Sequence, residues 1–174
     1  MPCIRPSMLH DIGKYSLRFQ RRLQKGDVQV DHSTAGAQLC AAKGGYYSFL
    51  NYCIAGHHAG LPDCGSNTDN GRESTLSGRL KKKIEDYQAY QSEIEVPLLH
   101  SAPIDPKAVP NPYFSLSFFM RMIYSCLVDA DFLDTEAFMK QGKTERDPGT
   151  RIEELYRKLD KYLENKRWLE NKKP

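Results

Sequence analysis

Several features are missing from this chain of 174 residues, and each absence excludes a class of protein. No apolar stretch is long enough to cross a bilayer, and the N-terminus lacks the apolar core of a signal peptide. The five cysteines are scattered and never spaced as CxxC, which argues against a zinc knuckle or a disulfide framework. No GxxxxGK[ST] phosphate loop occurs, so the sequence contains no ATP-driven motor of that kind. We therefore expect a cytoplasmic protein with reduced thiols and no membrane partner.

The chain also carries little excess charge. Its 25 Lys and Arg residues against 22 Asp and Glu give a net charge of +3, which permits a nucleic-acid partner without demonstrating one. The length suits one domain with a sizeable core. Cys40, Cys53 and Cys126 lie in apolar stretches and are expected to be small core residues rather than nucleophiles.

Hydrophobic residues recur at helical spacing almost throughout, and no alternating run is long enough for a sheet. Five of the ten prolines fall between 97 and 112, so that segment is expected to be irregular. The last predicted helix is expected to bury Ile152, Leu155, Leu159 and Tyr162. These patterns predict an all-α fold, with helices at about 9–25, 32–43, 46–58, 80–94, 115–133 and 150–170.

Four of the five histidines lie in the first third of the chain, each beside a predicted helix end. Imidazoles combined with carboxylates form a ligand set that suits first-row transition metals better than calcium or magnesium. Each element alone has an ordinary explanation, such as chance, a helix cap at Asp31, or an imidazole near a helix dipole. Their joint occurrence in this order favours a site, formed by His10, Asp11, His32, His57 and His58.

A carboxylate pair in the apolar segment near 127–133 supplies a further candidate. Asp129 and Asp131 are two residues apart, which is roughly 200° around an α-helix, so they cannot both face one site. One of the two is expected to be functional and the other to lie on the surface.

The residues around these candidates resemble four motifs of one family. Residues 9–14 with 19–20 are similar to its LHDIGK…FQ stretch, and 31–37 to its HSxxGA element. Residues 55–63 resemble GHHxGLPD, and 127–136 resemble LVxADxLDTE. The family is the nuclease domain of the CRISPR-associated type I helicase-nuclease, within the HD phosphohydrolase superfamily. The resemblance covers roughly residues 8–140, and the combination is hard to reach by chance.

The resemblance implies a compact helical HD domain over 1–146, with 147–174 forming a helix that leads toward a helicase part. It implies one or two divalent transition metal ions, with Mn, Co, Ni or Fe expected. It also selects Asp131 over Asp129, because the last ligand of the family is the aspartate of the Ala-Asp pair. Asp11 would be a catalytic residue that bridges the metals, and Lys14 would contact a phosphate, although a solvated lysine is an equal alternative. The implied metal ligands are His10, Asp11, His32, His57, His58 and Asp131.

The implied activity is metal-dependent cleavage of single-stranded DNA in CRISPR type I interference. The implied partners are single-stranded DNA, a helicase domain in cis or in trans, and the CRISPR RNA-guided surveillance complex. A solvated helix face is the favoured alternative for the basic run at 79–83. Side chains that could guide a DNA strand are Lys14, Arg18, Arg21, Arg22, Arg79, Lys81, Lys82 and Lys83.

One departure from the family bears on activity. The family carries a further histidine on a helix upstream of the His-Asp pair, whereas none of the nine residues before His10 is a histidine. Two prolines also make residues 1–6 a poor helix. We expect weaker metal binding at one position. Two alternatives remain open: an HD-type nucleotidase or cyclic phosphodiesterase for small nucleotides, and an inactive HD interaction module.

Overall fold

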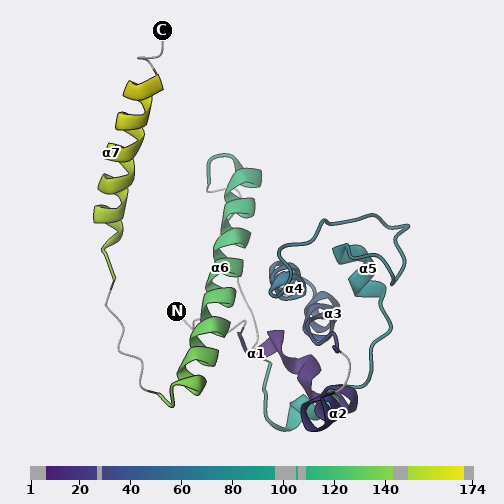
Figure 1. The fold of residues 1–174 in the computed structure, drawn as a ribbon. Coiled ribbons are helices and arrows are strands. Elements are labelled where there is room, and N and C mark those ends of the chain that lie inside the picture. The colour runs from purple at the N-terminus through teal and green to yellow at the C-terminus, as the bar shows by residue number, and fades with distance from the viewer. Residues whose placement is uncertain (1–6, 27–28, 97–104, 106–108, 143–148, 171–174) are drawn as a thin grey trace. The chain divides into compact units, whose positions relative to one another are not determined.

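A computed structural model describes residues 7–26, 29–96, 105, 109–142 and 149–170, and the regular structure in these ranges is entirely helical (Figure 1). The predicted all-α fold is confirmed. The chain divides into two units, Met1–Thr135 and Glu136–Pro174. The expected helix-poor segment 1–6 and the expected domain boundary at 146 lie outside the described residues. The elements are α1 (Ser7–His10), η1 (Ile12–Tyr15), α2 (Leu17–Lys25), α3 (Ser33–Lys43), α4 (Tyr47–Gly56), α5 (Leu76–Lys81), η2 (Gln88–Ser92), α6 (Pro112–Met139) and α7 (Ile152–Glu170).

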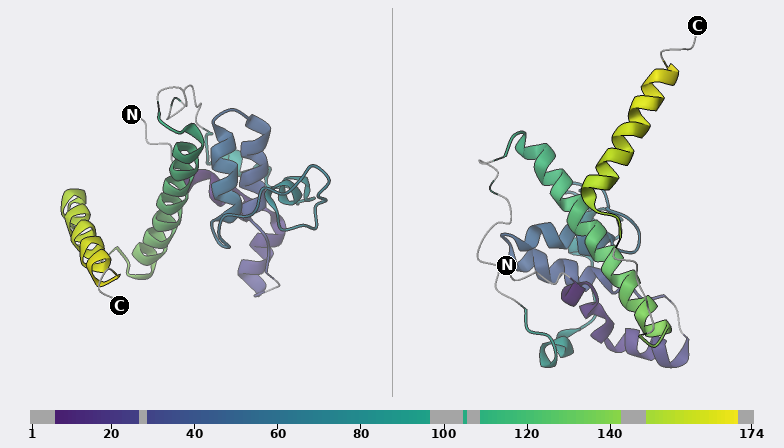
Figure 2. Two further views of the ribbon diagram at one scale, coloured as in Figure 1. Left: turned by 90° about the horizontal axis from the view of Figure 1, so that it is seen from above. Right: turned by 90° about the vertical axis from the view of Figure 1, so that its left-hand side faces the viewer.

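The centre of the first unit is the pair of helices α3 and α4, which run side by side (Figure 2). Their facing sides carry small and aliphatic residues, and this surface is completed by residues of α1, η1, η2 and α6. Close packing of small side chains lets the two helices approach and buries their shared face. The core consists of Leu9, Ile12, Ala35, Ala37, Cys40, Tyr47, Leu50, Cys53, Ile54, Ala55, Tyr90 and Leu127.

Two glycines allow the N-terminal segment to lie directly on α3. A Cβ at Gly36 would overlap the backbone carbonyl of Leu9, and a Cβ at Gly13 would overlap the carbonyl of His32. Neither carbonyl can swing away as a flexible side chain could. The absence of a side chain at these two positions therefore brings the His10-Asp11 pair next to His32.

The predicted helix at 9–25 is divided into α1, η1 and α2. Ser16 has extended backbone angles and separates η1 from α2. Its hydroxyl donates to the Gly13 carbonyl at 2.9 Å and accepts from the Phe19 amide, so it caps α2 from within the predicted helix. Gly26 ends α2 in the left-handed conformation, directly after the predicted helix end at residue 25. Leu23, near the end of α2, is exposed.

The predicted helix at 80–94 is wrong. Helix α5 ends at Lys81, Lys82 is extended, and only a short 3-10 turn, η2, forms before residue 94. The side-chain amide of Gln38 donates to the carbonyls of Arg79 and Lys82 at 3.1 and 2.7 Å. A continuing helix would need those carbonyls for its own amides. The Lys82 amide still donates to the Arg79 carbonyl at 3.1 Å, and the tertiary contact from α3 holds the chain where α5 ends.

Helix α6 lies beside α4 (Figure 2), and side chains of the two helices are in contact. Leu127 is almost completely buried in the core, and the Tyr124 hydroxyl donates to the Gly56 carbonyl at 3.4 Å. Cys126, expected in the core, is instead exposed, because it lies next to Leu127 on the turned-away side of the helix. Cys40 and Cys53 are buried as expected.

Helix α7 belongs to the second unit. The stripe expected to be buried is exposed, with Ile152 at 80% and Leu159 at 55%. On its polar side Lys158 pairs with Glu154, its i,i+4 neighbour, at 2.9 Å. Within the described parts of the chain, none of the helices is both long and apolar enough for a membrane crossing.

Candidate metal centre

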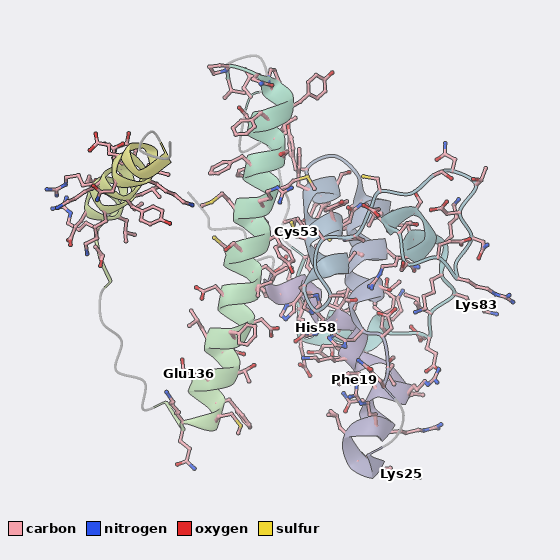
Figure 3. All side chains as sticks on the ribbon, turned by 45° about the horizontal axis from the view of Figure 1, so that its top comes forward. Phe19, Lys25, Cys53, His58, Lys83 and Glu136 are labelled. Carbon is pink, nitrogen blue, oxygen red and sulfur yellow. The ribbon has the colours of Figure 1, made fainter. Side chains whose placement is uncertain are left out.

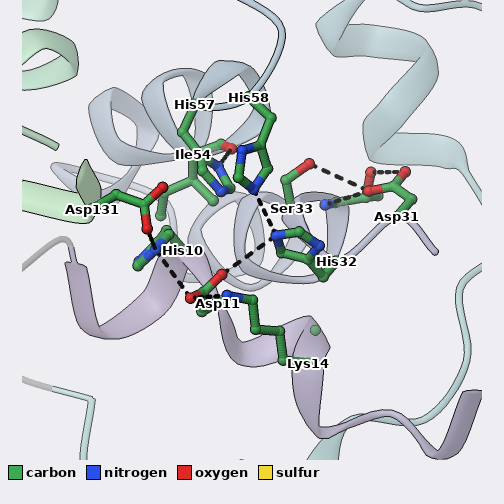
Figure 4. A network of polar contacts seen from close by, with 12 residues as sticks. His10, Asp11, Lys14, Asp31, His32, Ser33, Ile54, His57, His58 and Asp131 are labelled. Atoms are coloured by element: carbon green, nitrogen blue, oxygen red, sulfur yellow. Dashed lines mark hydrogen bonds and ion pairs between the residues drawn. The ribbon is translucent and has the colours of Figure 1, made fainter. Parts of the chain in front are cut away.

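The six predicted ligands come together from four separate segments of the chain (Figure 4). His10 is the last residue of α1 and Asp11 follows it, His32 precedes α3, and His57 and His58 follow α4. Asp131 approaches from α6, with its Oδ1 atom 3.4 Å from His10 Nε2. Side chains from His10 to Asp131 therefore meet at one place, because α3 and α4 place their termini at the same end of the core.

His57 has the environment of a metal ligand. Its ring lies 2.7 Å from the Ile54 carbonyl through Nδ1, which must therefore carry the proton and donate. This leaves the Nε2 lone pair, which is buried and has no hydrogen-bond partner among the described residues. Burial lowers the pKa of His57 to about 4, so the ring is neutral at physiological pH. A fixed tautomer with a free nitrogen is how proteins orient metal-binding imidazoles.

His32 and His58 form the other side of the site. Their Nε2 atoms are 2.9 Å apart, and the His32 ring also meets the edge of Phe19 with centroids 5.3 Å apart. Burial is the main cause that lowers the pKa of His32, which keeps this imidazole in its neutral form as well. At this distance the two Nε2 atoms could both coordinate one metal ion.

Asp11 lies between the two groups of histidines. Its Oδ2 atom is 3.2 Å from His10 Nε2, and its Oδ1 atom is 3.4 Å from His32 Nε2. Burial alone would raise the pKa of this carboxyl, but the hydrogen bond and charge of His10, together with the Lys14 ammonium at 2.6 Å, outweigh it and hold the pKa well below its ordinary value. A carboxylate with one oxygen toward each group is suited to bridge two ions.

Of the two candidate aspartates on α6, Asp131 faces the site and Asp129 faces solvent. Asp131 follows the buried Leu127 by four residues, so the two share one side of the helix. The expectation that only one aspartate can reach a shared site is confirmed, and the structure brings Asp131 to it.

The donor set fits a transition metal. Ligand atoms of His32, His57 and His58 lie within 4.8 Å of one another, and so do those of His10, Asp11 and His57. Ligands at about 2.0–2.2 Å from a zinc-sized ion are separated by roughly 3–4 Å, so small side-chain shifts would bring either group to bonding distance. Neutral imidazoles and an ionised carboxylate also supply the protonation states that metal binding requires. The chain therefore contains groups of His and Asp residues that can hold a metal ion.

Most of the predicted DNA-guiding residues near α5 have partners within the protein. Arg79 donates to Ser33 Oγ and to the Ala55 carbonyl, at 3.1 and 2.9 Å. Lys81 donates to the carbonyls of Asn67 and Asp69, and Lys82 pairs with Asp31 at 2.6 Å. Lys83 points outward (Figure 3), and Arg18 on α2 is exposed. The run therefore anchors the segment 61–83, a role that its sequence does not reveal, while DNA contact stays a prediction.

Comparison with protein-family models, curated proteins and solved structures finds no match for this chain. The prediction of the site therefore rests on residue types, their order and the resemblance of the four motifs. Sequence reasoning missed the contact of Phe19 with His32 and the position of Arg22 beside them. Their i,i+3 spacing on α2 is the one signal available, and it occurs on most helices without any such role.

Proposed function

We propose that this protein is a metal-dependent phosphodiesterase that cleaves single-stranded DNA. The observation that carries the proposal is the buried Nε2 lone pair of His57, which lies among His10, Asp11, His32 and His58 and receives no hydrogen bond from any residue that the structure describes. An unsatisfied buried nitrogen costs about 1–3 kcal/mol unless a ligand takes it. A bound cation would remove this cost.

The chain's own residues have distinct roles in such a reaction. His32, His57 and His58 would hold one ion, His10 and Asp131 the other, and Asp11 both. When bound, the ions would polarise the phosphodiester, activate a water molecule and stabilise the leaving oxygen. Lys14, whose ammonium lies 2.6 Å from Asp11, would orient that carboxylate and offer a positive charge to a phosphate oxygen.

The surface beside His32 and His58 supports a polymeric substrate. A groove of about 700 Å³ opens to solvent there and is lined by charged and polar side chains, including Arg22 and Arg79. No aromatic ring other than the two histidines lines it among the described residues, so it lacks a stacking platform for a single base. These features favour a strand over a small nucleotide.

The proposed biological setting rests on the resemblance of the four motifs and not on the geometry of the site. Action in CRISPR type I interference, with a helicase domain in cis or in trans and an RNA-guided surveillance complex, remains part of the proposal. A divalent transition metal agrees with the nitrogen-rich donor set, and the choice of Mn, Co, Ni or Fe follows from the resemblance.

The test is cleavage of circular single-stranded DNA by the purified chain after metal removal and addition of Mn²⁺, Co²⁺ or Ni²⁺. Linearisation of the circle that is abolished by chelation is expected, because a circle offers no ends and reports internal cutting only. Parallel assays with nucleoside monophosphates and cyclic dinucleotides test the small-substrate alternative. Tight metal binding without cleavage of any of these substrates would contradict the proposal and favour the inactive interaction module.

A further inference from the structure

We infer that the groove beside His32 and His58 is the path of the DNA strand, and that Arg22 and Arg79 position the strand by contacting its phosphates. This inference rests on the proposed function and adds the side of the metal centre from which substrate extends. The strand groove, as we call it, is bordered by Arg22, Asp31, Ser33 and Arg79 and reaches the two histidines. Its volume of about 700 Å³ admits a short piece of strand next to the scissile bond.

Arg22 is held in position before any ligand arrives. Its guanidinium carbon lies 5.9 Å from the centroid of the Phe19 ring, one turn earlier on α2. The same ring meets His32 edge-on, so α2 links the arginine to the metal centre through one aromatic side chain. Among the described residues, no carboxylate pairs with Arg22. Its charge is therefore available to an anion in the groove.

Arg79 contributes from α5, on a different element. Both of its protein hydrogen bonds, to Ser33 and to the Ala55 carbonyl, leave from Nη1. A guanidinium has five N–H donors, so Nε and Nη2 keep donors that these bonds do not use. The two bonds fix the plane of the group, which lowers the entropy cost of contacting a phosphate.

The acidic side chain in the groove wall does not oppose an anion. Asp31 accepts from the Lys82 ammonium at 2.6 Å, the Thr34 hydroxyl at 2.7 Å and the Thr34 amide at 3.2 Å. Its charge is thus compensated by groups of the protein itself. Two arginines from separate elements with a neutralised carboxylate give an excess of positive charge. Such a groove follows a phosphate backbone and does not select bases.

The test is strand binding by the whole chain, measured in chelator by fluorescence anisotropy of labelled oligothymidylate and oligoadenylate across a salt series. Arg22→Gln should weaken binding of both oligomers about three- to fivefold at moderate salt. It should also lower the slope of log K against log salt by about 0.7, the value for one phosphate contact on a single strand. Lys43→Gln is the matched control, because Lys43 also lies over an aromatic ring, 5.7 Å from the Tyr47 centroid, but outside the groove.

Arg79→Lys provides a second variant, which keeps the charge at α5 and loses the fork of donors. We expect it to weaken binding with little change in the salt slope, provided that its circular dichroism matches the parent chain. Equal affinities and slopes for the parent, Arg22→Gln and Lys43→Gln would overturn the inference. Hydrolysis of bis(p-nitrophenyl) phosphate by the metal-loaded parent chain tests the proposed function separately, since this small diester does not need the strand groove.

Discussion

At the scale of single residues, helix geometry decides which of two carboxylates, Asp129 or Asp131, lies in the candidate site. Leu127 fixes the rotation of α6 because it is 1% exposed and packed in the core. One turn later Asp131 lies 3.4 Å from His10, whereas Asp129 is turned to solvent. The buried Leu127 and the candidate ligand Asp131 thus lie on the same face of α6.

Asp131→Ala should reduce metal-dependent cleavage of single-stranded DNA by roughly 100-fold or more, because it removes a charged ligand from the site. Asp129→Ala, its neighbour on the opposite side of α6, should stay within about twofold of the parent. Initial cleavage rates at saturating Mn²⁺ measure both. Losses of similar size in the two variants would remove the distinction between these aspartates.

The cysteines should differ sharply in reactivity. Burial raises the pKa of both Cys40 and Cys53 to about 12, so these thiols are neither ionised nor accessible at pH 8. Cys64 and Cys126 are exposed and should be alkylated by iodoacetamide within minutes. Peptide mapping by mass spectrometry distinguishes the four sites. In urea all four should react, and fast labelling of Cys40 in the native chain would contradict the described core.

At the scale of elements, close backbone approaches place the N-terminal segment against α3. An alanine at Gly36 would gain up to about 1 kcal/mol in helix propensity. Its methyl group, however, would overlap the Leu9 carbonyl, which has no freedom to move aside. Overpacking of this kind costs about 1–3 kcal/mol, so the unfavourable effect should win.

Gly36→Ala should therefore lower the free energy of unfolding by about 1–2 kcal/mol, as measured by urea denaturation. Ser48→Ala, at an exposed position of α4, should change it by less than about 0.5 kcal/mol. The glycine variant should also bind metal more weakly, because the overlap pushes Leu9 and the adjoining His10 away from α3. A more stable Gly36→Ala chain would mean that α1 does not approach α3 as described.

The elements differ in how far the sequence predicts them. Hydrophobic spacing predicts α3, α4 and α6; α3 and α4 supply most of the buried core, whereas α6 contributes Leu127. The spacing fails for 80–94, where the Gln38 amide from α3 takes the carbonyls of Arg79 and Lys82. Hydrophobic spacing also misses the break at Ser16, whose hydroxyl donates to the Gly13 carbonyl and accepts from the Phe19 amide. Both failures come from polar contacts that a periodicity does not encode.

The candidate site was predicted better than the elements around it. The order of the histidines and Asp11 predicts five of the side chains that meet, because ligand chemistry restricts residue type strongly. The choice of Asp131 over Asp129 came from the motif resemblance. The contacts that orient these side chains were not predictable. Two examples are the hydrogen bond from His57 to the Ile54 carbonyl and the contact of Phe19 with His32. Both depend on where the helices end in space.

At the scale of the whole molecule, the metal centre connects four segments that are far apart in the chain. Asp11, His32, His57 and Asp131 each come from a different one. An ion bound by several of them would link α1, α3, α4 and α6 directly. Metal binding should therefore be strongly coupled to the stability of the first unit.

Addition of Mn²⁺ or Co²⁺ at a hundredfold excess over its dissociation constant should stabilise the fold by about 2.7 kcal/mol. For a unit of this size that corresponds to a rise in Tm of roughly 10 °C, measured by circular dichroism. The same concentration of Mg²⁺ should give a much smaller rise, because magnesium prefers oxygen ligands. His57→Ala should lose most of the Mn²⁺ effect. Equal responses to Mn²⁺ and Mg²⁺ would argue against a nitrogen-rich site.

The distribution of these ligands along the chain also sets the order in which the site is completed during synthesis. His10 to His58 leave the ribosome early, whereas Asp131 follows only after the long connection between η2 and α6. A nascent chain with all its histidines but without α6 would lack one carboxylate of the centre. Under the proposed function, nuclease activity would thus appear late in translation, after most of the first unit has been made.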